Sequence, residues 1–170
     1  KTSRTTFKRI KETPRQLMAK ISQLDHEFAS YAATEAGKLL LDIRAGNHNL
    51  NSSDLDLGTY GDIQSHELLV KLISDQFPED MILSEEANDD PSRISKDRVW
   101  IIDPLDGTTN FLHGFPQYCV SIALEQKGEI TQAVIYDPNR NDLFTASKGQ
   151  GAYLNQRRIR VSTKSKLKES

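Results

Sequence analysis

The chain has 170 residues, and its 22 Lys and Arg against 24 Asp and Glu give a formal net charge of −2 at pH 7. This length fits one domain with a buried core, and the balanced charge does not favour nucleic acid or a membrane surface as the main partner. No stretch approaches the roughly 20 apolar residues of a membrane span, and no signal-peptide core is present. The single cysteine, Cys119, excludes an internal disulfide and suits a reducing, cytoplasmic location.

Residues 1–20 are rich in Lys and Arg, with Glu12 as their one acidic residue. Because they show no clear apolar period, we predict an N-terminal extension that is flexible or partly helical, separate from a domain of residues 21–170. The basic charge would suit a contact with RNA, but a solvated tail is the simpler interpretation.

Two helices are predicted next. Apolar residues recur at steps of three and four along residues 24–43, which predicts a helix with one apolar face. Residues 47–61 are polar and predict a loop. Asp62 is the predicted N-cap of a second helix, which Pro78 ends. His66 lies on this helix and is interpreted as a partly buried residue, because magnesium sites rarely use histidine.

Two predicted strands each end in acidic residues. Residues 81–84 lead into Glu85 and Glu86, and residues 99–102 lead into Asp103. After Asp103, Pro104 lacks a backbone donor and Gly107 permits positive φ, so the chain must turn.

This turn has the donors for a cation and an anion. Asp103, Asp106 and the Leu105 carbonyl between them are oxygen ligands of the kind that Mg²⁺ prefers. Free amides at Gly107 and Thr108 would face an incoming anion if a helix begins there. Taken alone, however, Asp-x-x-Asp-Gly is more often an ordinary polar turn than a metal site.

From residue 118 onward the pattern changes to alternating apolar residues separated by short turns. We predict antiparallel strands over residues 118–124, 130–137 and 143–146, and a fourth that begins at residue 151. Arg157, Arg158 and Arg160 are interpreted as a solvated basic edge.

One long stretch identifies a family. This stretch reads Trp100-Ile101-Ile102-Asp103-Pro104-Leu105-Asp106-Gly107-Thr108-Thr109-Asn110-Phe111. It resembles the signature of the inositol monophosphatase family, whose members are lithium-sensitive, magnesium-dependent phosphatases. The resemblance runs from about residue 24 to residue 162. It implies an α+β fold with two long helices packed on an antiparallel sheet. This is the N-terminal half of the αβαβα sandwich of the inositol monophosphatase and fructose-1,6-bisphosphatase fold.

The resemblance also implies Mg²⁺ as cofactor and gives roles to particular residues. The implied metal ligands are Glu85, Asp103, the Leu105 carbonyl and Asp106, with Asp56 as a weaker ligand. The implied catalytic residues, which would orient the attacking water, are Glu85 and Thr108. The implied contacts to the substrate phosphate are Leu105, Asp106, Gly107 and Thr108. In this scheme one ion activates the water, a second stabilises the leaving oxygen, and Asp103 bridges them.

The substrate prediction has alternatives. Residues 109–111 favour the inositol monophosphatase branch and inositol 1-phosphate, whereas residues 83–90 and 97–100 resemble phosphatases of 3′-phosphoadenosine 5′-phosphate. Nothing in residues 148–170 matches the second α/β domain of the family. The chain therefore resembles the first half of an enzyme, and a non-catalytic regulatory or binding module is the alternative from another class. We expect an exposed apolar sheet face and a homodimer.

Overall fold

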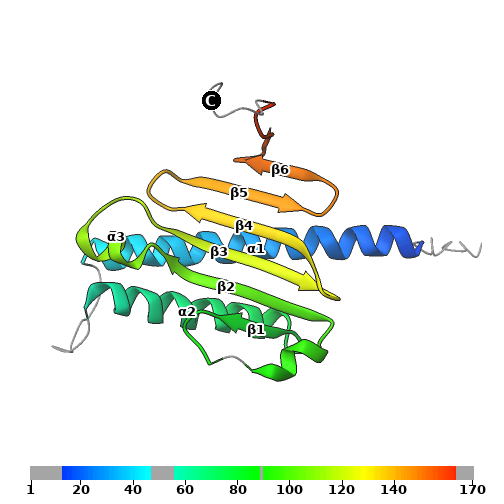
Figure 1. The fold of residues 1–170 in the computed structure, drawn as a ribbon, viewed down its shortest axis with the longest axis horizontal. Coiled ribbons are helices and arrows are strands. Elements are labelled where there is room, and N and C mark those ends of the chain that lie inside the picture. The colour runs from blue at the N-terminus through cyan, green and yellow to red at the C-terminus, as the bar shows by residue number, and fades with distance from the viewer. Residues whose placement is uncertain (1–12, 47–55, 89, 164–170) are drawn as a thin grey trace, which may run out of the picture.

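The computed structural model describes residues 13–46, 56–88 and 90–163 (Figure 1). Within these residues seven strands form one sheet in chain order from β1 to β7. The helical elements are α1 (Pro14–Arg44), α2 (Leu57–Gln76), the 3₁₀ helix η1 (Pro91–Ser95) and α3 (Thr108–His113). The strands are β1 (Met81–Ser84), β2 (Arg98–Asp106), β3 (Cys119–Gln126), β4 (Glu129–Asp137), β5 (Asp142–Ser147), β6 (Gly151–Leu154) and β7 (Arg157–Ile159).

Helix α1 begins ten residues earlier than predicted, within the stretch expected to be an extension. A capping box causes the early start: the Gln16 N–H donates to the Thr13 side chain, and the Thr13 N–H donates to the Gln16 side chain. Pro14 occupies the first helical turn, where its missing N–H costs nothing. The predicted extension is flexible or partly helical; residues 14–20 are helical, and residues 1–12 lie outside the described ranges.

The predicted start of α2 at Asp62 is wrong. The N-cap is Asp56, whose carboxylate accepts a hydrogen bond from the Thr59 N–H at 2.9 Å. The end of the predicted loop is therefore helical, and Asp62 lies inside the helix. The C-terminal end at Gln76, just before Pro78, agrees with the prediction.

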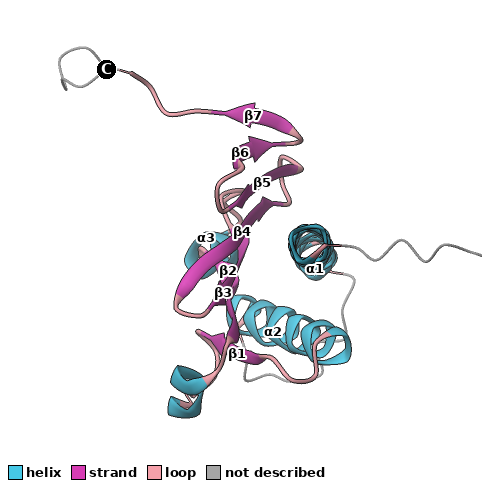
Figure 2. Cartoon of the chain, turned by 90° about the vertical axis from the view of Figure 1, so that its right-hand side faces the viewer, coloured by secondary structure: helices cyan, strands magenta, loops and turns pink. Residues whose placement is uncertain are grey.

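Both long helices pack on one face of the sheet, as Figure 2 shows edge-on. The sheet contributes Trp100, Ile122, Leu124 and Val134 to the core, and the helices contribute Ala36, Leu40, Leu69 and Ile73; all are at most 1% exposed. This confirms the predicted α+β fold. One feature of the sheet differs from the prediction, because β1 pairs with β2 in parallel while all later neighbours are antiparallel.

The opposite sheet face carries exposed apolar side chains. Ile135 and Phe144 are neighbours across β4 and β5, and they are 44% and 36% exposed. The expected exposed apolar surface is therefore confirmed. Strand β7 extends the sheet at the arginines that were predicted to be a solvated edge, and these arginines are exposed. None of the helices in the described ranges has the length and apolar character of a membrane span.

Candidate active site

The parallel pairing of β1 and β2 brings the two predicted acidic segments together. Ser84 pairs with Ile102, and the Glu85 N–H donates to the Ile102 carbonyl at 3.4 Å. Because parallel strands run in the same direction, the residues that follow them meet at one edge of the sheet. Glu85 therefore lies beside Asp103, close enough for its negative charge to raise the pKa of Asp103.

A β-bulge turns the two aspartates of β2 to the same side. Asp103 pairs with Ser121 and Asp106 pairs with Cys119, so three steps along β2 match two steps along β3. Residues three apart in a regular strand point to opposite faces, whereas residues two apart share a face. The extra residue in the bulge therefore puts Asp106 on the Asp103 face, a re-aiming that is common next to active sites.

Asp103 has an electrostatic environment that disfavours its charged form. Burial, together with the negative charges of Glu85 and Asp106, raises its pKa to about 6. The side chain is half-buried and Glu85 is exposed, so the pair lies at the mouth of the site. A cation bound between these groups would relieve the repulsion.

Asp106 also contacts the single cysteine. The Cys119 Sγ donates to Asp106 Oδ2 at 3.6 Å. Burial, together with the neighbouring Asp106 carboxylate, raises the pKa of this thiol to about 12. Cys119 is half-buried and protonated at neutral pH, which is typical of a structural cysteine.

Helix α2 adds a residue that the sequence analysis missed. Asp62 is 7% exposed, and its pKa is raised to about 6. Burial is the main cause, the charges of Glu86, Asp103 and Glu85 contribute in the same direction, and Thr108 acts in the opposite direction. Asp62, Ser65 and Leu69 are all buried, so the helical spacing of Asp62 from Leu69 could have shown that this acid faces inward.

Thr108 lies between α2 and the turn. Its hydroxyl donates to the Leu105 carbonyl at 3.1 Å and is within hydrogen-bond reach of Asp62. Helix α2 can approach Thr108 closely because Gly58 has no side chain. A Cβ at this position would lie only 2.9 Å from the Thr108 methyl group. Gly107 has a φ of 96° and begins α3, which confirms the predicted turn.

Asp56 lies at the start of α2. Hydrogen bonds from the Thr59 backbone and side chain lower its pKa, and the residue is exposed. Its carboxylate therefore has a local partner and a structural role as the N-cap. A weaker metal-binding role remains a prediction, because residues 47–55 before it lie outside the described ranges.

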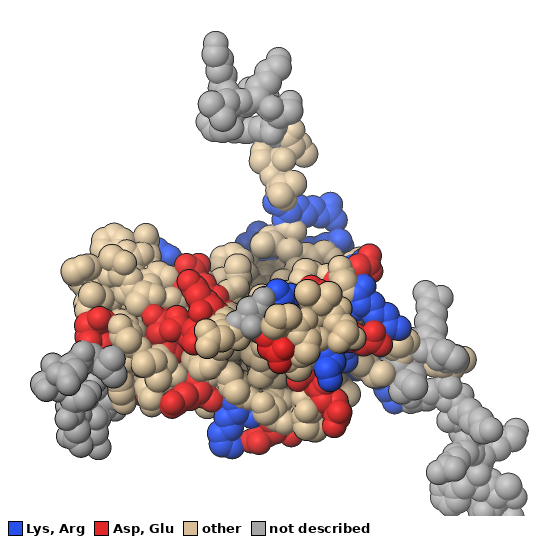
Figure 3. Space-filling model, turned by 60° about the horizontal axis from the view of Figure 1, so that its bottom comes forward, with Lys and Arg blue, Asp and Glu red and all other residues tan. Residues whose placement is uncertain are grey.

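The donor chemistry of the site fits a hard divalent cation. Glu85, Asp103 and Asp106 supply carboxylate oxygens, and the Leu105 carbonyl lies in the same turn. Among the described residues, no three His, Cys, Asp or Glu side chains converge as a ready-made metal site. One reason is that the Asp106 carboxylate accepts from the Cys119 thiol and is turned toward it. In Figure 3 acidic side chains appear on both halves of the face, and most of the basic ones lie on the right-hand half.

A separate cleft of about 440 Å³ lies between α1 and the β5–β6 hairpin. Hydroxyl and amide side chains line it, and several already bond within the protein: Ser147 donates to Gln132 at 2.6 Å, and Tyr153 donates to the Gln150 carbonyl. The predicted site residues lie at the other end of the molecule. The cleft is therefore not the candidate active site.

Comparisons with known proteins agree with the signature. Residues 22–170 match the sequence model of the inositol monophosphatase family. The chain is 46% identical over 142 residues to the Nus factor SuhB of Xylella fastidiosa, a match that covers 80% of this chain and 50% of that protein. It is 39% identical to inositol monophosphatase 1 of Solanum lycopersicum, with 82% and 52% of the two chains covered.

Solved structures show the same relationship. The inositol monophosphatase of Anabaena superposes with a TM-score of 0.72 and 34% identity, covering 87% of this chain and 52% of that one. The chain thus spans about half the length of the relatives that it matches. The match over residues 22–170 and the shared fold both show that this chain belongs to the inositol monophosphatase family.

Proposed function

We propose that this chain is the N-terminal part of a magnesium-dependent phosphomonoesterase that hydrolyses inositol 1-phosphate. The observation that carries the proposal is the parallel pairing of β1 and β2, which puts Glu85 beside Asp103, with the buried Asp62 near enough for both charges to raise its pKa. Two of these acids have raised pKa values, which is typical of functional sites. In this proposal residues 21–170 are the N-terminal domain, and the remaining half of the family fold completes the enzyme.

The side chains divide the work between the metal, the water and the phosphate. Glu85, Asp103, Asp106 and the Leu105 carbonyl would hold Mg²⁺, which supplies Lewis acidity for a phosphate ester and a more acidic bound water. Glu85 and the Thr108 hydroxyl orient the water. The Leu105 carbonyl, which accepts from Thr108, fixes the direction of that hydroxyl, and the buried Asp62 lies beside it. The Gly107 and Thr108 amides at the start of α3 face the phosphate oxygens.

Inositol 1-phosphate is the proposed substrate because residues 109–111 resemble that branch of the family, and the matched tomato protein is named an inositol monophosphatase. Hydrolysis of 3′-phosphoadenosine 5′-phosphate is the alternative, supported by residues 83–90. Cytoplasmic location, lithium sensitivity and a homodimer accompany the proposal as family features.

A second candidate function has its own support. Several relatives, among them those from Xylella fastidiosa and Pasteurella multocida, are named Nus factor SuhB. This chain could therefore belong to a protein that acts as a binding module, with the basic residues 1–20 contacting RNA. The exposed Ile135 and Phe144 face supplies a second surface for a macromolecular contact.

The deciding experiment measures phosphate release from inositol 1-phosphate and from 3′-phosphoadenosine 5′-phosphate, with and without Mg²⁺. Asp103→Asn removes a carboxylate from the centre of the site and should abolish Mg²⁺-dependent release. Asp75→Asn, on the exposed side of α2, is the matched control and should keep it. Phosphate release from only one of the two substrates would assign the protein to the corresponding branch of the family.

Thermal melting tests the site independently of turnover. Mg²⁺ should raise the melting temperature of the wild type, because a ligand that binds only the folded state stabilises it by about 2.7 kcal/mol at 100 times its Kd. The Asp103→Asn variant should show no shift. A wild type with neither a Mg²⁺ shift nor phosphate release would contradict the metal site and favour the binding module.

A further inference from the structure

His66 contacts the segment that carries the acid pair. Its Nδ1 atom lies 2.8 Å from the Ser84 hydroxyl oxygen, which joins α2 to the last residue of β1. Ser84 is 5% exposed, so this contact is shielded from water. The sequence analysis placed His66 on the helix but gave it no partner.

The hydrogen bonds around Ser84 fix the shape of the turn that follows. The Glu86 N–H donates to the Ser84 hydroxyl oxygen at 3.3 Å, and the Ala87 N–H donates to the Ser84 carbonyl at 3.2 Å. On the other side, the Glu85 N–H donates to Ile102. Glu85 thus lies between two anchored positions, although its own side chain is exposed.

A serine hydroxyl has one proton to donate and two lone pairs with which it can accept. The Ser84 oxygen accepts from the Glu86 N–H, and its own proton can be donated to Nδ1 of the neutral His66 tautomer that is protonated on Nε2. In that tautomer His66 is an acceptor that holds the Ser84 hydroxyl in the rotamer needed to receive the Glu86 amide.

We infer that His66 and Ser84 form a positioning pair for the metal-binding acid turn. The pair holds the backbone at Glu85 and Glu86 so that the Glu85 carboxylate stays beside Asp103. Groups that orient metal ligands from behind commonly change metal affinity by about 10- to 100-fold when they are removed. This inference rests on the proposed function, because it assigns the pair a role in metal binding.

The chain offers a matched control. His26 on α1 also contacts a strand serine through Nδ1, at 3.2 Å from the Ser147 hydroxyl. Both histidines are half-buried on a long helix that packs on the same sheet face. Ser147 is in β5, away from the acid turn, so a His26→Ala change tests the general loss of a histidine–serine contact.

The experiment measures Mn²⁺ and Mg²⁺ dissociation constants by calorimetry on the full chain, together with hydrogen exchange at the Glu86 amide. His66→Ala and Ser84→Ala should weaken metal binding by about tenfold and speed exchange at Glu86. His66→Asn should stay near the wild type in both measurements, because its side-chain oxygen can accept from Ser84 in place of Nδ1. His26→Ala should change neither.

The outcomes separate this inference from the proposed function. If the wild type binds metal and His66→Ala binds it equally well, the positioning role is wrong while the proposed function stands. Unchanged exchange at Glu86 in His66→Ala would also overturn it. If the wild type binds neither metal, the proposed function fails and the positioning inference fails with it. Should His66→Ala be unfolded, a weak-binding but folded His66→Asn would equally count against the acceptor role.

Discussion

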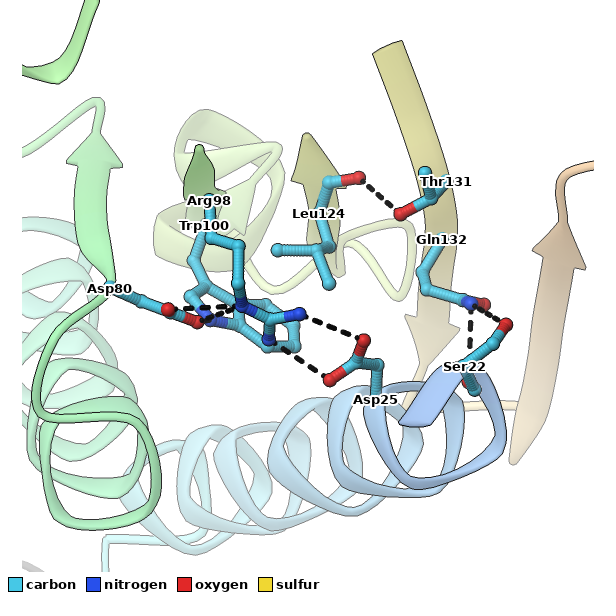
Figure 4. Close-up of polar contacts among 8 residues, drawn as sticks. All are labelled: Ser22, Asp25, Asp80, Arg98, Trp100, Leu124, Thr131 and Gln132. Carbon is cyan, nitrogen blue, oxygen red and sulfur yellow. Dashed lines mark hydrogen bonds and ion pairs between the residues drawn. The ribbon is translucent and has the colours of Figure 1, made fainter. Parts of the chain in front are cut away.

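The two ends of β2 each gather carboxylates, but they balance the charge differently. At the start of the strand, Arg98 donates to Asp80 at 2.8 and 3.0 Å and to Asp25 at 3.0 and 3.1 Å (Figure 4). Trp100 also donates to Asp80 through its indole N–H at 2.9 Å. At the other end, Asp103 faces Glu85 and Asp106, which are both negative.

The contrast shows how a structural carboxylate cluster differs from a candidate binding cluster. Burial lowers the pKa of Arg98, but hydrogen bonds to Asp25 and Asp80 raise it by more, so the group is secured as a cation. At the other end of β2, burial and the neighbouring negative charges instead raise the pKa of Asp103, which disfavours its charged form. Because buried charges need partners, a cluster without an internal cation is suited to an external one.

Removing the internal cation should have the largest effect. Arg98→Met leaves Asp25 buried without its partner, since the Asp25 side chain is 2% exposed. We expect a loss of about 3 kcal/mol in the free energy of unfolding, measured by urea denaturation. The substitution would also remove a cation–π contact, in which the Arg98 guanidinium carbon lies 5.2 Å from the centroid of the Phe77 ring.

Arg140→Met is the control for that change. Arg140 pairs with Asp137 at 2.9 Å, but its side chain is 58% exposed. Exposed pairs contribute little, so the loss should stay below about 1 kcal/mol. Equal losses in the two variants would show that the Arg98 cluster is not special, and the comparison between the two ends of β2 would fail.

A smaller effect, of opposite sign, is expected at the uncompensated end. The folded pKa of Asp62 is about 6, above its ordinary value of 3.8, so ionisation at neutral pH opposes folding. Asp62→Asn should therefore stabilise the metal-free protein by about 1 kcal/mol near pH 8, after allowance for solvent screening. The gain should shrink as the pH falls below about 6 and vanish below about pH 3, where Asp62 is protonated in both states.

Urea titrations in EDTA at several pH values measure this gain. Asp75→Asn removes a negative charge from the exposed side of the same helix and serves as the control. A destabilised Asp62→Asn at pH 8 would mean that the Thr108 hydrogen bond outweighs the burial of the charge. In that case Asp62 would be a structural residue and not part of the uncompensated cluster.

The sequence predicted the elements that depend on local pattern. The periodicity of α1 and α2, the end of β1 at Ser84 and the turn at Gly107 all appear in the structure. Their signals, namely apolar spacing, a strand followed by acids and a glycine, lie within a few residues of each element. The fold class and the family followed from these patterns together with the signature.

The features that the sequence analysis missed depend on contacts between distant segments or on competing caps. The bulge that turns Asp106 to the Asp103 face depends on the register with β3, which no local pattern specifies. Asp62 was taken for a cap because Asp, which favours caps, precedes an apolar period, while Asp56 performs that role six residues earlier. The Thr13–Gln16 capping box is a local signal, but it lies in a basic segment with no clear apolar period.

The smallest expected effect distinguishes the two roles of Asp56. As the N-cap of α2 it accepts from the Thr59 N–H at 2.9 Å and from the Thr59 hydroxyl at 3.1 Å. Asp56→Ala should lower the melting temperature by a few degrees through loss of the cap. Asp56→Ser should keep a melting temperature near that of the wild type, because serine also caps helices. Because a serine hydroxyl caps a helix but is a poor substitute for a carboxylate at Mg²⁺, the Ser variant separates capping from metal binding. Unchanged Mg²⁺ affinity in Asp56→Ser would assign Asp56 to the helix, and a weakened affinity at a wild-type melting temperature would restore it to the metal site.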